Sequence, residues 1–186
     1  MTVLIIYATI EGQTGKVARF IEAQLNTAGH ETRLVDAADK LVDVSFDGID
    51  KVILAAPVHE RRHPKPFETL ITSVHRDLNA RDTLLLSISM NAAFPEGREE
   101  AQDYVDEMML RTGVKPRTVA LVAGAVRNHR YDYYASQVLR HVVLRNREFD
   151  PGAESHEFTD WDALKASVAG FIDAPANAWS TASKPE

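Results

Sequence analysis

The side chains best suited to chemistry lie near the N-terminus, where two threonines and a glycine follow a short apolar segment. Thr9, Gly12 and Thr14 have the spacing Thr-x-x-Gly-x-Thr, directly after Val3–Ala8. Val3–Ala8 is rich in β-branched residues, which is typical of a parallel strand buried on both faces. From Thr14 the apolar residues recur at helical spacing, so the amides of the loop lie at a helix N-terminus, which favours an anion. The pattern predicts a phosphate-binding loop.

Two common phosphate-binding motifs are excluded at this loop. The nucleotide triphosphatase motif G-x-x-x-x-G-K-S/T requires a glycine where Ile10 stands and a hydroxyl residue where Val17 stands. The dinucleotide fingerprint G-x-G-x-x-G is also absent. The remaining pattern resembles the phosphate loop of flavodoxins, in which hydroxyls and amides hold the phosphate of FMN without a cation. The alternative is an ordinary strand-to-helix turn with a threonine cap.

Length and composition are those of a globular domain that would need a bound cofactor for redox chemistry. The 186 residues fit one hydrophobic core, and the absence of cysteine excludes disulfides, thiol catalysis and cysteine-bound iron–sulfur clusters. No segment approaches the ~20 apolar residues of a membrane span, and the chain begins with a strand rather than a signal peptide. We therefore expect a cytoplasmic protein, with peripheral attachment to the inner face of the plasma membrane left open.

Charge is unevenly distributed along the chain. The net charge is −6, yet residues 127–147 contain five arginines and one acid, a local charge of +4. An acidic body with one basic segment argues against general nucleic-acid binding, which prefers a broadly basic domain. It allows local contact with an anionic ligand or a lipid surface.

Apolar strands alternate with amphipathic helices along the chain, which predicts a parallel sheet with helices on both faces. The expected strands are Val3–Ala8, Glu31–Asp36, Val52–Val58, Thr83–Ser89 and Thr118–Val126. The expected helices begin at Thr14 and then cover Phe67–Asn79, Arg98–Arg111 and Trp161–Phe171. The fold class is therefore α/β. The resemblance of the first loop to flavodoxins implies a flavodoxin-like three-layer fold with a five-stranded parallel sheet in the order 2-1-3-4-5.

A long interval near the fifth strand departs from this alternation. Residues 127–157 exceed a typical connection, and the apolar residues between Ala135 and Val143 predict an amphipathic helix that is basic on its polar side. This basic helical insertion could pack on its own domain or face lipid or substrate. We expect one flavodoxin-like domain over residues 1–173, followed by a disordered tail over residues 174–186.

In open parallel sheets, ligands bind outside the carboxyl ends of the strands, where the strand order reverses. This rule gathers the loops 9–14, 57–64 and 89–95, the first to hold phosphate and the other two to flank a planar ring system. The candidate cofactor-binding residues are Thr9, Ile10, Glu11, Gly12, Gln13, Thr14, Pro57, Val58, His59, Ser89, Met90, Asn91 and Phe94. Phe94 is the only aromatic residue among them.

The second of these loops also contains two histidines and two arginines. His59 and His63 are four residues apart, but Pro64 argues for a loop and no carboxylates complete a metal site, so we expect no bound metal. Each histidine could instead contact flavin or substrate, or lie in solvent. Arg61 and Arg62 are expected to be exposed, although a cation beside a flavin stabilises its anionic reduced form.

The chain resembles the flavodoxin-fold, quinone-dependent protoporphyrinogen oxidase family from Thr2 to about Asp173. The segments that carry the resemblance are Thr9-Ile10-Glu11-Gly12-Gln13-Thr14, Val58-His59-Glu60-Arg61-Arg62-His63, Ala123-Gly124-Ala125-Val126-Arg127-Asn128-His129-Arg130-Tyr131 and Thr159-Asp160-Trp161. The first is shared by flavodoxin relatives, whereas the last two are more specific. The chain departs from the family at Pro57, where serine is usual, at Arg61, where glycine is usual, and over residues 150–155. These departures bear mainly on the substrate and leave the FMN site largely intact.

The resemblance implies bound FMN and a dehydrogenase that oxidises protoporphyrinogen IX to protoporphyrin IX for haem biosynthesis, with a quinone as acceptor at the inner membrane face. The chemistry belongs to the flavin, so no catalytic side chain is identified. Candidates for contact with substrate or membrane are His63, Arg127, Arg130, Tyr131 and Arg140, since guanidinium groups match propionates and lipid phosphates. A flavodoxin-type electron carrier, an NAD(P)H:quinone reductase and a flavin-free binding domain are the alternatives. The oligomeric state, monomer or homo-oligomer, stays open.

Overall fold

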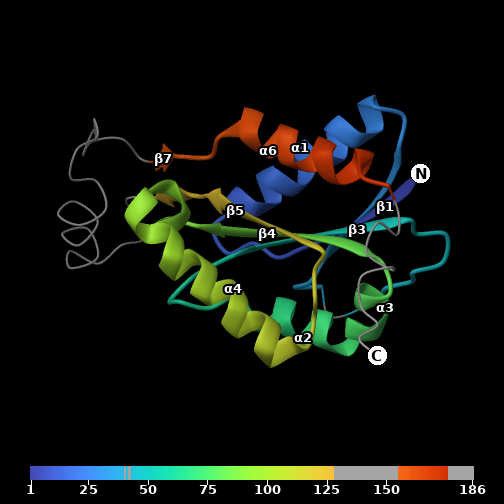
Figure 1. The fold of residues 1–186 in the computed structure, drawn as a ribbon, viewed down its shortest axis with the longest axis horizontal. Coiled ribbons are helices and arrows are strands. Elements are labelled where there is room, and N and C mark those ends of the chain that lie inside the picture. The colour runs from blue at the N-terminus through green and yellow to red at the C-terminus, as the bar shows by residue number, and fades with distance from the viewer. Residues whose placement is uncertain (40, 42, 128–154, 176–186) are drawn as a thin grey trace, which may run out of the picture.

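The computed structural model of the chain describes residues 1–39, 41, 43–127 and 155–175 (Figure 1). Its centre is a parallel sheet of five strands in the order β2-β1-β3-β4-β5, which confirms the predicted topology. The strands are β1 (Thr2–Tyr7), β2 (Glu31–Asp36), β3 (Lys51–Pro57), β4 (Asp82–Ser89) and β5 (Thr118–Ala123). The predicted helix over residues 135–143 and residues 176–186 of the tail lie outside the described residues.

Helices cover both faces of the sheet and complete the three-layer fold. Figure 1 shows α1 (Gln13–Thr27) and α6 (Trp161–Asp173) on one face, with α2 (Lys65–Ser73), α3 (His75–Asn79) and α4 (Arg98–Thr112) on the other. Two short 3-10 turns, η1 (Asn91–Ala93) and η2 (Pro95–Gly97), connect β4 to α4. None of the described helices is both long and apolar enough to cross a bilayer.

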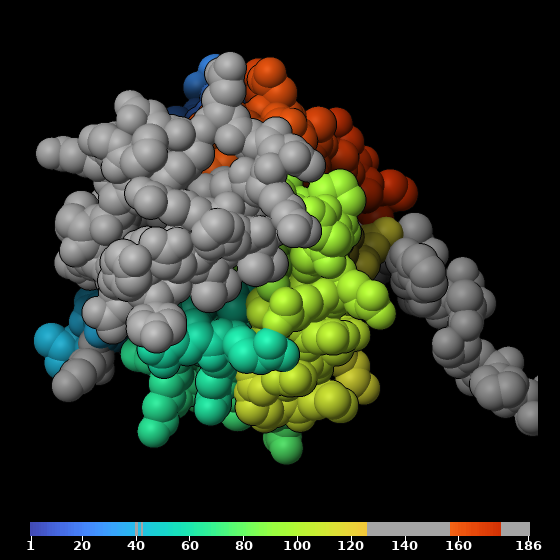
Figure 2. Space-filling view, turned by 90° about the vertical axis from the view of Figure 1, so that its left-hand side faces the viewer, coloured from blue at the N-terminus to red at the C-terminus, as the bar shows by residue number. Residues whose placement is uncertain are grey.

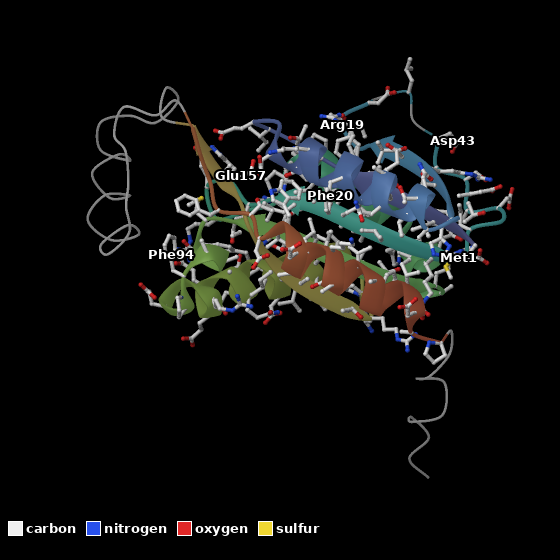
Figure 3. All side chains as sticks on the ribbon, turned by 90° about the horizontal axis from the view of Figure 1, so that it is seen from above. Met1, Arg19, Phe20, Asp43, Phe94 and Glu157 are labelled. Atoms are coloured by element: carbon white, nitrogen blue, oxygen red, sulfur yellow. The ribbon has the colours of Figure 1, made fainter. Side chains whose placement is uncertain are left out.

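The buried strands explain why the sheet needs both helical layers. Ile5 and its odd-numbered neighbours in β1 pack into the core with α1 and α6, whereas Leu4 and Ile6 pack into the core with α2 and α4. Side chains alternate along a strand, so an uninterrupted apolar run supplies two cores at once. In Figure 3, Phe20 on α1 lies on the side of α6, where its ring centroid is 4.8 Å from that of Trp161.

One predicted helix is divided in two. The helix expected over Phe67–Asn79 begins earlier, at Lys65, and is interrupted at Val74, whose φ of −111° and ψ of 15° leave the helical region. Pro66 accounts for the early start, since proline is favoured in the first helical turn. The interruption redirects the chain, so that Leu78 is fully buried while Val74 is only partly buried.

The fifth strand is shorter than predicted. Its last residue is Ala123, after which Gly124 leaves the sheet. The next two strands form an antiparallel pair, β6 (Ala125–Arg127) and β7 (Ser155–Glu157). The carbonyl of Gly124 accepts from Phe158 N–H (3.0 Å), whereas its own N–H donates to Ser89 O (3.1 Å). The two ends of the predicted insertion therefore lie side by side at the carboxyl end of the sheet.

Candidate functional site

The loops at the carboxyl edge of the sheet enclose a cavity of about 60 Å³. It is lined by Thr9, Ile10, Glu11, Gln13, Thr14, Pro57, Val58, His59, Ile88, Ser89, Met90, Gly124 and Ala125. Most of these residues are among the predicted cofactor ligands. The volume suits a phosphate-sized group, since sites for drug-sized ligands measure roughly 300–1,000 Å³. A larger ligand bound here must therefore extend beyond the enclosed part.

The phosphate loop is shaped by its own backbone. Gly12 caps α1 in the left-handed region, with φ of 93°, and its N–H donates to Thr9 Oγ1 (2.9 Å). The helix cap is thus this glycine rather than a threonine, and any side chain there would be strained. Thr14 in the first turn is almost fully buried, and that turn contains no acidic residue. The start of α1 therefore keeps the unpaired amides and the positive dipole end that favour an anion.

A residue from the far end of the chain closes this loop. Thr159 is buried, and its hydroxyl donates to Ala123 O (2.7 Å) and accepts from Gln13 Nε2 (2.9 Å). It thereby joins the end of β5 to the start of α1. The next residue, Asp160, is the N-cap of α6 and accepts from Ala163 N–H (2.9 Å). The packing of the loop and of α6 explains these two residues of the Thr-Asp-Trp segment.

We expect Thr159→Val to lower the free energy of unfolding by about 2 kcal/mol, because a buried group left without its partner costs roughly 1–3 kcal/mol. Valine keeps the shape of threonine but removes the donor to Ala123 O and one acceptor of the Gln13 amide. Urea denaturation measures the loss. Thr159→Ser keeps the hydroxyl and should lose less than half as much. Equal losses in the two variants would contradict this role.

The lysine that follows the loop is neutralised by Glu157. Lys16 Nζ pairs with Glu157 Oε2 (2.5 Å), and Trp161 Nε1 donates to the other carboxylate oxygen (2.6 Å). Burial raises the pKa of the Glu157 carboxyl, but the hydrogen bonds from Lys16 and Trp161 outweigh burial and lower the pKa below its usual value. Figure 3 shows Glu157 beside the start of α1. Since no lysine or arginine is among the described residues that line the cavity, anion binding there depends on amides and hydroxyls.

The second loop makes a tight turn beside the cavity. Val58 N–H donates to Ile88 O (2.7 Å), so the loop starts as a continuation of the sheet. His59 and Arg62 then exchange backbone hydrogen bonds of 2.9 and 3.1 Å. His59 is exposed and lines the cavity, as expected for a residue that contacts a ligand.

The structure buries His63, which corrects the alternative that it lies in solvent, whereas its contact with substrate stays a prediction. The residue is 1% exposed, its Nε2 lies 3.0 Å from Ser87 Oγ, and its Nδ1 has no partner among the described residues. Burial lowers the pKa of the ring to about 4, although Glu68 acts in the opposite direction. His63 is therefore neutral near pH 7. The physical reason is that α2 begins directly after Pro64, which packs His63 against the sheet.

Glu68 holds the far side of the second loop. Its carboxylate is 6% exposed and accepts from Arg62 (2.6 Å) and Arg111 (2.8 Å). Burial raises the pKa of this carboxyl, but the hydrogen bonds from Arg111 and Arg62 outweigh burial, and the pKa lies below its usual value. The second loop, α2 and α4 are thus joined at one carboxylate.

We expect Glu68→Gln to lower the free energy of unfolding by about 2 kcal/mol at neutral pH, since hydrogen bonds to charged groups contribute roughly 1.5–3 kcal/mol. A carboxyl with a depressed folded pKa stabilises the fold above its unfolded pKa and loses this contribution as pH falls through the folded pKa. The difference between wild type and variant should be constant above about pH 6 and shrink below about pH 4. Urea titrations across this range measure it, and a difference independent of pH would contradict the ionic role.

Two predicted cofactor ligands in the third loop do not line the cavity. Asn91 Nδ2 donates instead to Glu100 Oε2 (2.7 Å) and to Tyr104 Oη (3.1 Å), both on α4. Phe94 is buried, with its ring centroid 6.1 Å from that of Phe158. These contacts place both side chains away from the lining of the cavity, and their contact with the cofactor stays a prediction.

Three cavity residues escaped the sequence analysis, namely Ile88, Gly124 and Ala125. Only their positions could have indicated them, because Pro57 pairs with Ile88 in the sheet and Gly124 directly follows the last residue of β5. Gly12, in contrast, is a predicted cofactor ligand that shapes the phosphate loop but is not one of the residues that line the cavity.

The predicted substrate contacts in the basic segment are not located by the described residues. Arg127 is described only through its backbone, which pairs with Ser155 in the β6–β7 pair. Arg130, Tyr131 and Arg140 lie outside the described residues, so their roles stay predictions.

Known proteins match this chain in sequence and in fold. A family model described as a flavodoxin domain matches residues 4–150. Protoporphyrinogen IX dehydrogenase (quinone) of Escherichia coli strain K12 is 21% identical over 179 residues, which cover 94% of this chain and 98% of that protein. Oxidised Flavodoxin 1 from Bacillus cereus has a TM-score of 0.56 at 15% identity, covering 94% of this chain and 99% of that one. A short-chain flavodoxin associated with a bacterial microcompartment has a TM-score of 0.52 at 14% identity, covering 92% and 97%.

Proposed function

We propose a function from one premise, which is that this chain belongs to the flavodoxin domain family. Its cofactor is FMN, and the observation that carries this assignment is the cavity at the N-terminus of α1. The donor set fits a phosphate, because helix amides and threonine hydroxyls surround the space and no cation is required. Gly124 leaves the wall of this cavity free of a side chain, since even a Cβ there would lie 3.3 Å from Ile88 Cγ2.

Bound FMN supplies two-electron redox chemistry, and the residues of the chain bind and orient it. Thr9, Thr14 and the first amides of α1 would hold the phosphate. The second and third loops, through His59 and Met90, would flank the ring. The part of the ligand that extends beyond the enclosed cavity is the part that a bulky partner can approach.

We infer protoporphyrinogen IX as the substrate and a quinone as the electron acceptor. The support is the relative of that name, whose likeness extends over 94% of this chain despite an identity of 21%. The Thr159-Asp160-Trp161 segment adds to it, because it is one of the segments that carry the resemblance to that family. Oxidation removes hydrogen from the porphyrinogen in pairs, and each pair reduces one quinone to a quinol.

The test is anaerobic mixing of FMN-loaded protein with protoporphyrinogen IX, with and without a quinone, while flavin absorbance and porphyrin fluorescence are followed. We expect bleaching that quinone reverses, with porphyrin appearing faster than in a protein-free control. A flavin that stays oxidised with this donor but bleaches with NADPH would contradict the substrate and identify a reductase. A chain that never retains FMN would contradict the cofactor itself.

A flavodoxin-type electron carrier is the second candidate function. The likeness of the fold to Flavodoxin 1, over 94% of this chain, favours it. A carrier would exchange electrons with another protein and would not accelerate porphyrinogen oxidation by quinone. The same mixing experiment therefore separates the two.

We also propose that the basic segment contacts propionate groups or lipid phosphates at the inner membrane face. Replacing Arg127, Arg130 and Arg140 together with glutamine should weaken binding to anionic vesicles or to porphyrin about tenfold, because each cation near a lipid surface contributes up to roughly 1 kcal/mol. Vesicle sedimentation measures binding to anionic vesicles, and fluorescence titration measures binding to porphyrin. FMN affinity should not change, and unchanged affinity for both anionic partners would contradict the role.

A further inference from the structure

A turn beside the cavity contains backbone conformations that its residues rarely adopt. In the His59–Arg62 turn, Glu60 and Arg61 have φ values of 50° and 65°, in the left-handed region that favours glycine. They are the only non-glycine residues with positive φ in the part of the chain that the structure describes. Such conformations persist where surrounding contacts impose them, and they cluster at ligand sites.

Arg61 is held by two side chains of α4, which also bind Asn91 of the third loop. Its Nη1 pairs with Glu100 Oε1, and its guanidinium carbon lies 5.5 Å from the centroid of the Tyr104 ring. The other oxygen of Glu100 accepts from Asn91 Nδ2 (2.7 Å), which also donates to Tyr104 Oη (3.1 Å). We call these four residues, Arg61, Asn91, Glu100 and Tyr104, the clasp. In Figure 2 the second loop, in teal, meets the surface of α4, in yellow-green.

Tyr104 is neutral within the clasp. Burial and the hydrogen bond with Glu100 raise the pKa of Tyr104 to about 12, so the phenol stays neutral beside the ion pair. Asn91 links the same carboxylate to the third loop. The clasp therefore connects the two loops that border the cavity through one helix, α4.

We propose that the clasp makes Arg61 a positioning residue of the cofactor site. It imposes the strained conformation of the His59–Arg62 turn and so places Val58 and His59 at the cavity wall. Arg61 does not line the cavity itself, so it acts through the turn. The C-terminal end of the turn is held separately, by the ion pair between Arg62 and Glu68 (2.6 Å). This inference rests on the proposed function, because the ligand that the turn positions is FMN.

The test compares alanine with glycine at the same position. Arg61→Ala removes the clasp but keeps a Cβ at positive φ, so the turn should relax and the dissociation constant for FMN should rise about tenfold. Arg61→Gly also removes the clasp but tolerates positive φ, so its dissociation constant should stay within about twofold of wild type. Fluorescence quenching of FMN measures both.

Substitutions at Glu100 test the same ion pair from its other partner. Glu100→Ala should behave like Arg61→Ala, whereas the double variant Arg61→Gly/Glu100→Ala should behave like Arg61→Gly. Glu107→Ala is the control, because Glu107 lies on the same helix and pairs with Arg111 outside the clasp. A double variant as impaired as Glu100→Ala would overturn the proposal, since Glu100 would then act through the third loop.

Hydrogen exchange of the His59 and Arg62 amides, which bond to each other's carbonyls, gives a readout that needs no FMN. In the cofactor-free protein, Arg61→Ala and Glu100→Ala should speed this exchange about tenfold, whereas Arg61→Gly should not. Wild-type protein that binds no FMN would refute the proposed function, and exchange would still test the clasp. If the alanine and glycine variants at position 61 behaved alike, both impaired or both normal, the proposal would be overturned. The backbone conformation of the turn would then not be the cause of any change in FMN binding.

Discussion

Replacing Gly124 with valine is expected to weaken FMN binding roughly 100-fold, because overpacking a close contact costs up to about 3 kcal/mol. Gly124 lines the cavity where the chain leaves β5. A Cβ alone would lie 3.3 Å from Ile88 Cγ2, and valine adds two methyl groups beyond it. Methyl groups added to the lining of this small cavity leave less room for a bound phosphate.

Fluorescence quenching of FMN measures this loss, and thermal melting of the cofactor-free protein separates it from unfolding. Gly124→Ala should lie between wild type and the valine variant, because only a shift of a few tenths of an ångström is needed to accept one methyl group. Gly170→Ala is the control on α6, where a Cβ would meet nothing within 4 Å. A valine variant that binds FMN as tightly as wild type would show that the ligand does not occupy this cavity.

Replacing Gly97 with alanine is expected to lower the melting temperature by roughly 6–12 °C, since overpacking of about 3 kcal/mol shifts a chain of this size by 2–4 °C per kcal/mol. A Cβ at Gly97 would lie 2.5 Å from Asn91 O and 3.0 Å from Asn91 Cα, both backbone atoms of the third loop. Backbone cannot rotate away as a flexible side chain can. The loop that carries Ser89 and Met90 must therefore shift.

Calorimetry measures the loss, and the same Gly170→Ala variant is the control, because the identical chemical change there meets open space. Alanine is favoured over glycine inside a helix by up to about 1 kcal/mol, so the control should be unchanged or more stable. The φ of Gly97 is −93°, which alanine adopts readily, so the cost arises from space and not from backbone strain. An unchanged melting temperature for Gly97→Ala would contradict the close approach of these segments.

The layers could be predicted because they depend on neighbouring residues. The apolar run in β1 is long enough for one strand and alternates between two cores, so it can be buried only between two helical layers. The change to helical spacing after Thr14 places a loop and a helix N-terminus at the end of that strand. These signals are local, and they were sufficient for the layers and for the position of the loop, whereas the strand order came from the resemblance to flavodoxins.

Individual side chains could not be placed in this way. His63 is buried by the turn into α2, and Asn91 bonds to Glu100 on the next helix instead of lining the cavity. Thr159 completes the site from 146 residues beyond Gln13, a relation that no local pattern reports.

By itself the sequence determined the fold class and the loop able to hold a phosphate, and its resemblance to flavodoxins supplied the strand order. Only the tertiary structure decided which side chains face the cavity, which ones the helices bury, and that Arg61 is held by Glu100. The physical reason is that periodicity and turn chemistry belong to residues adjacent along the chain. Burial, ion pairing and close approach depend instead on which distant segments meet when the chain is folded.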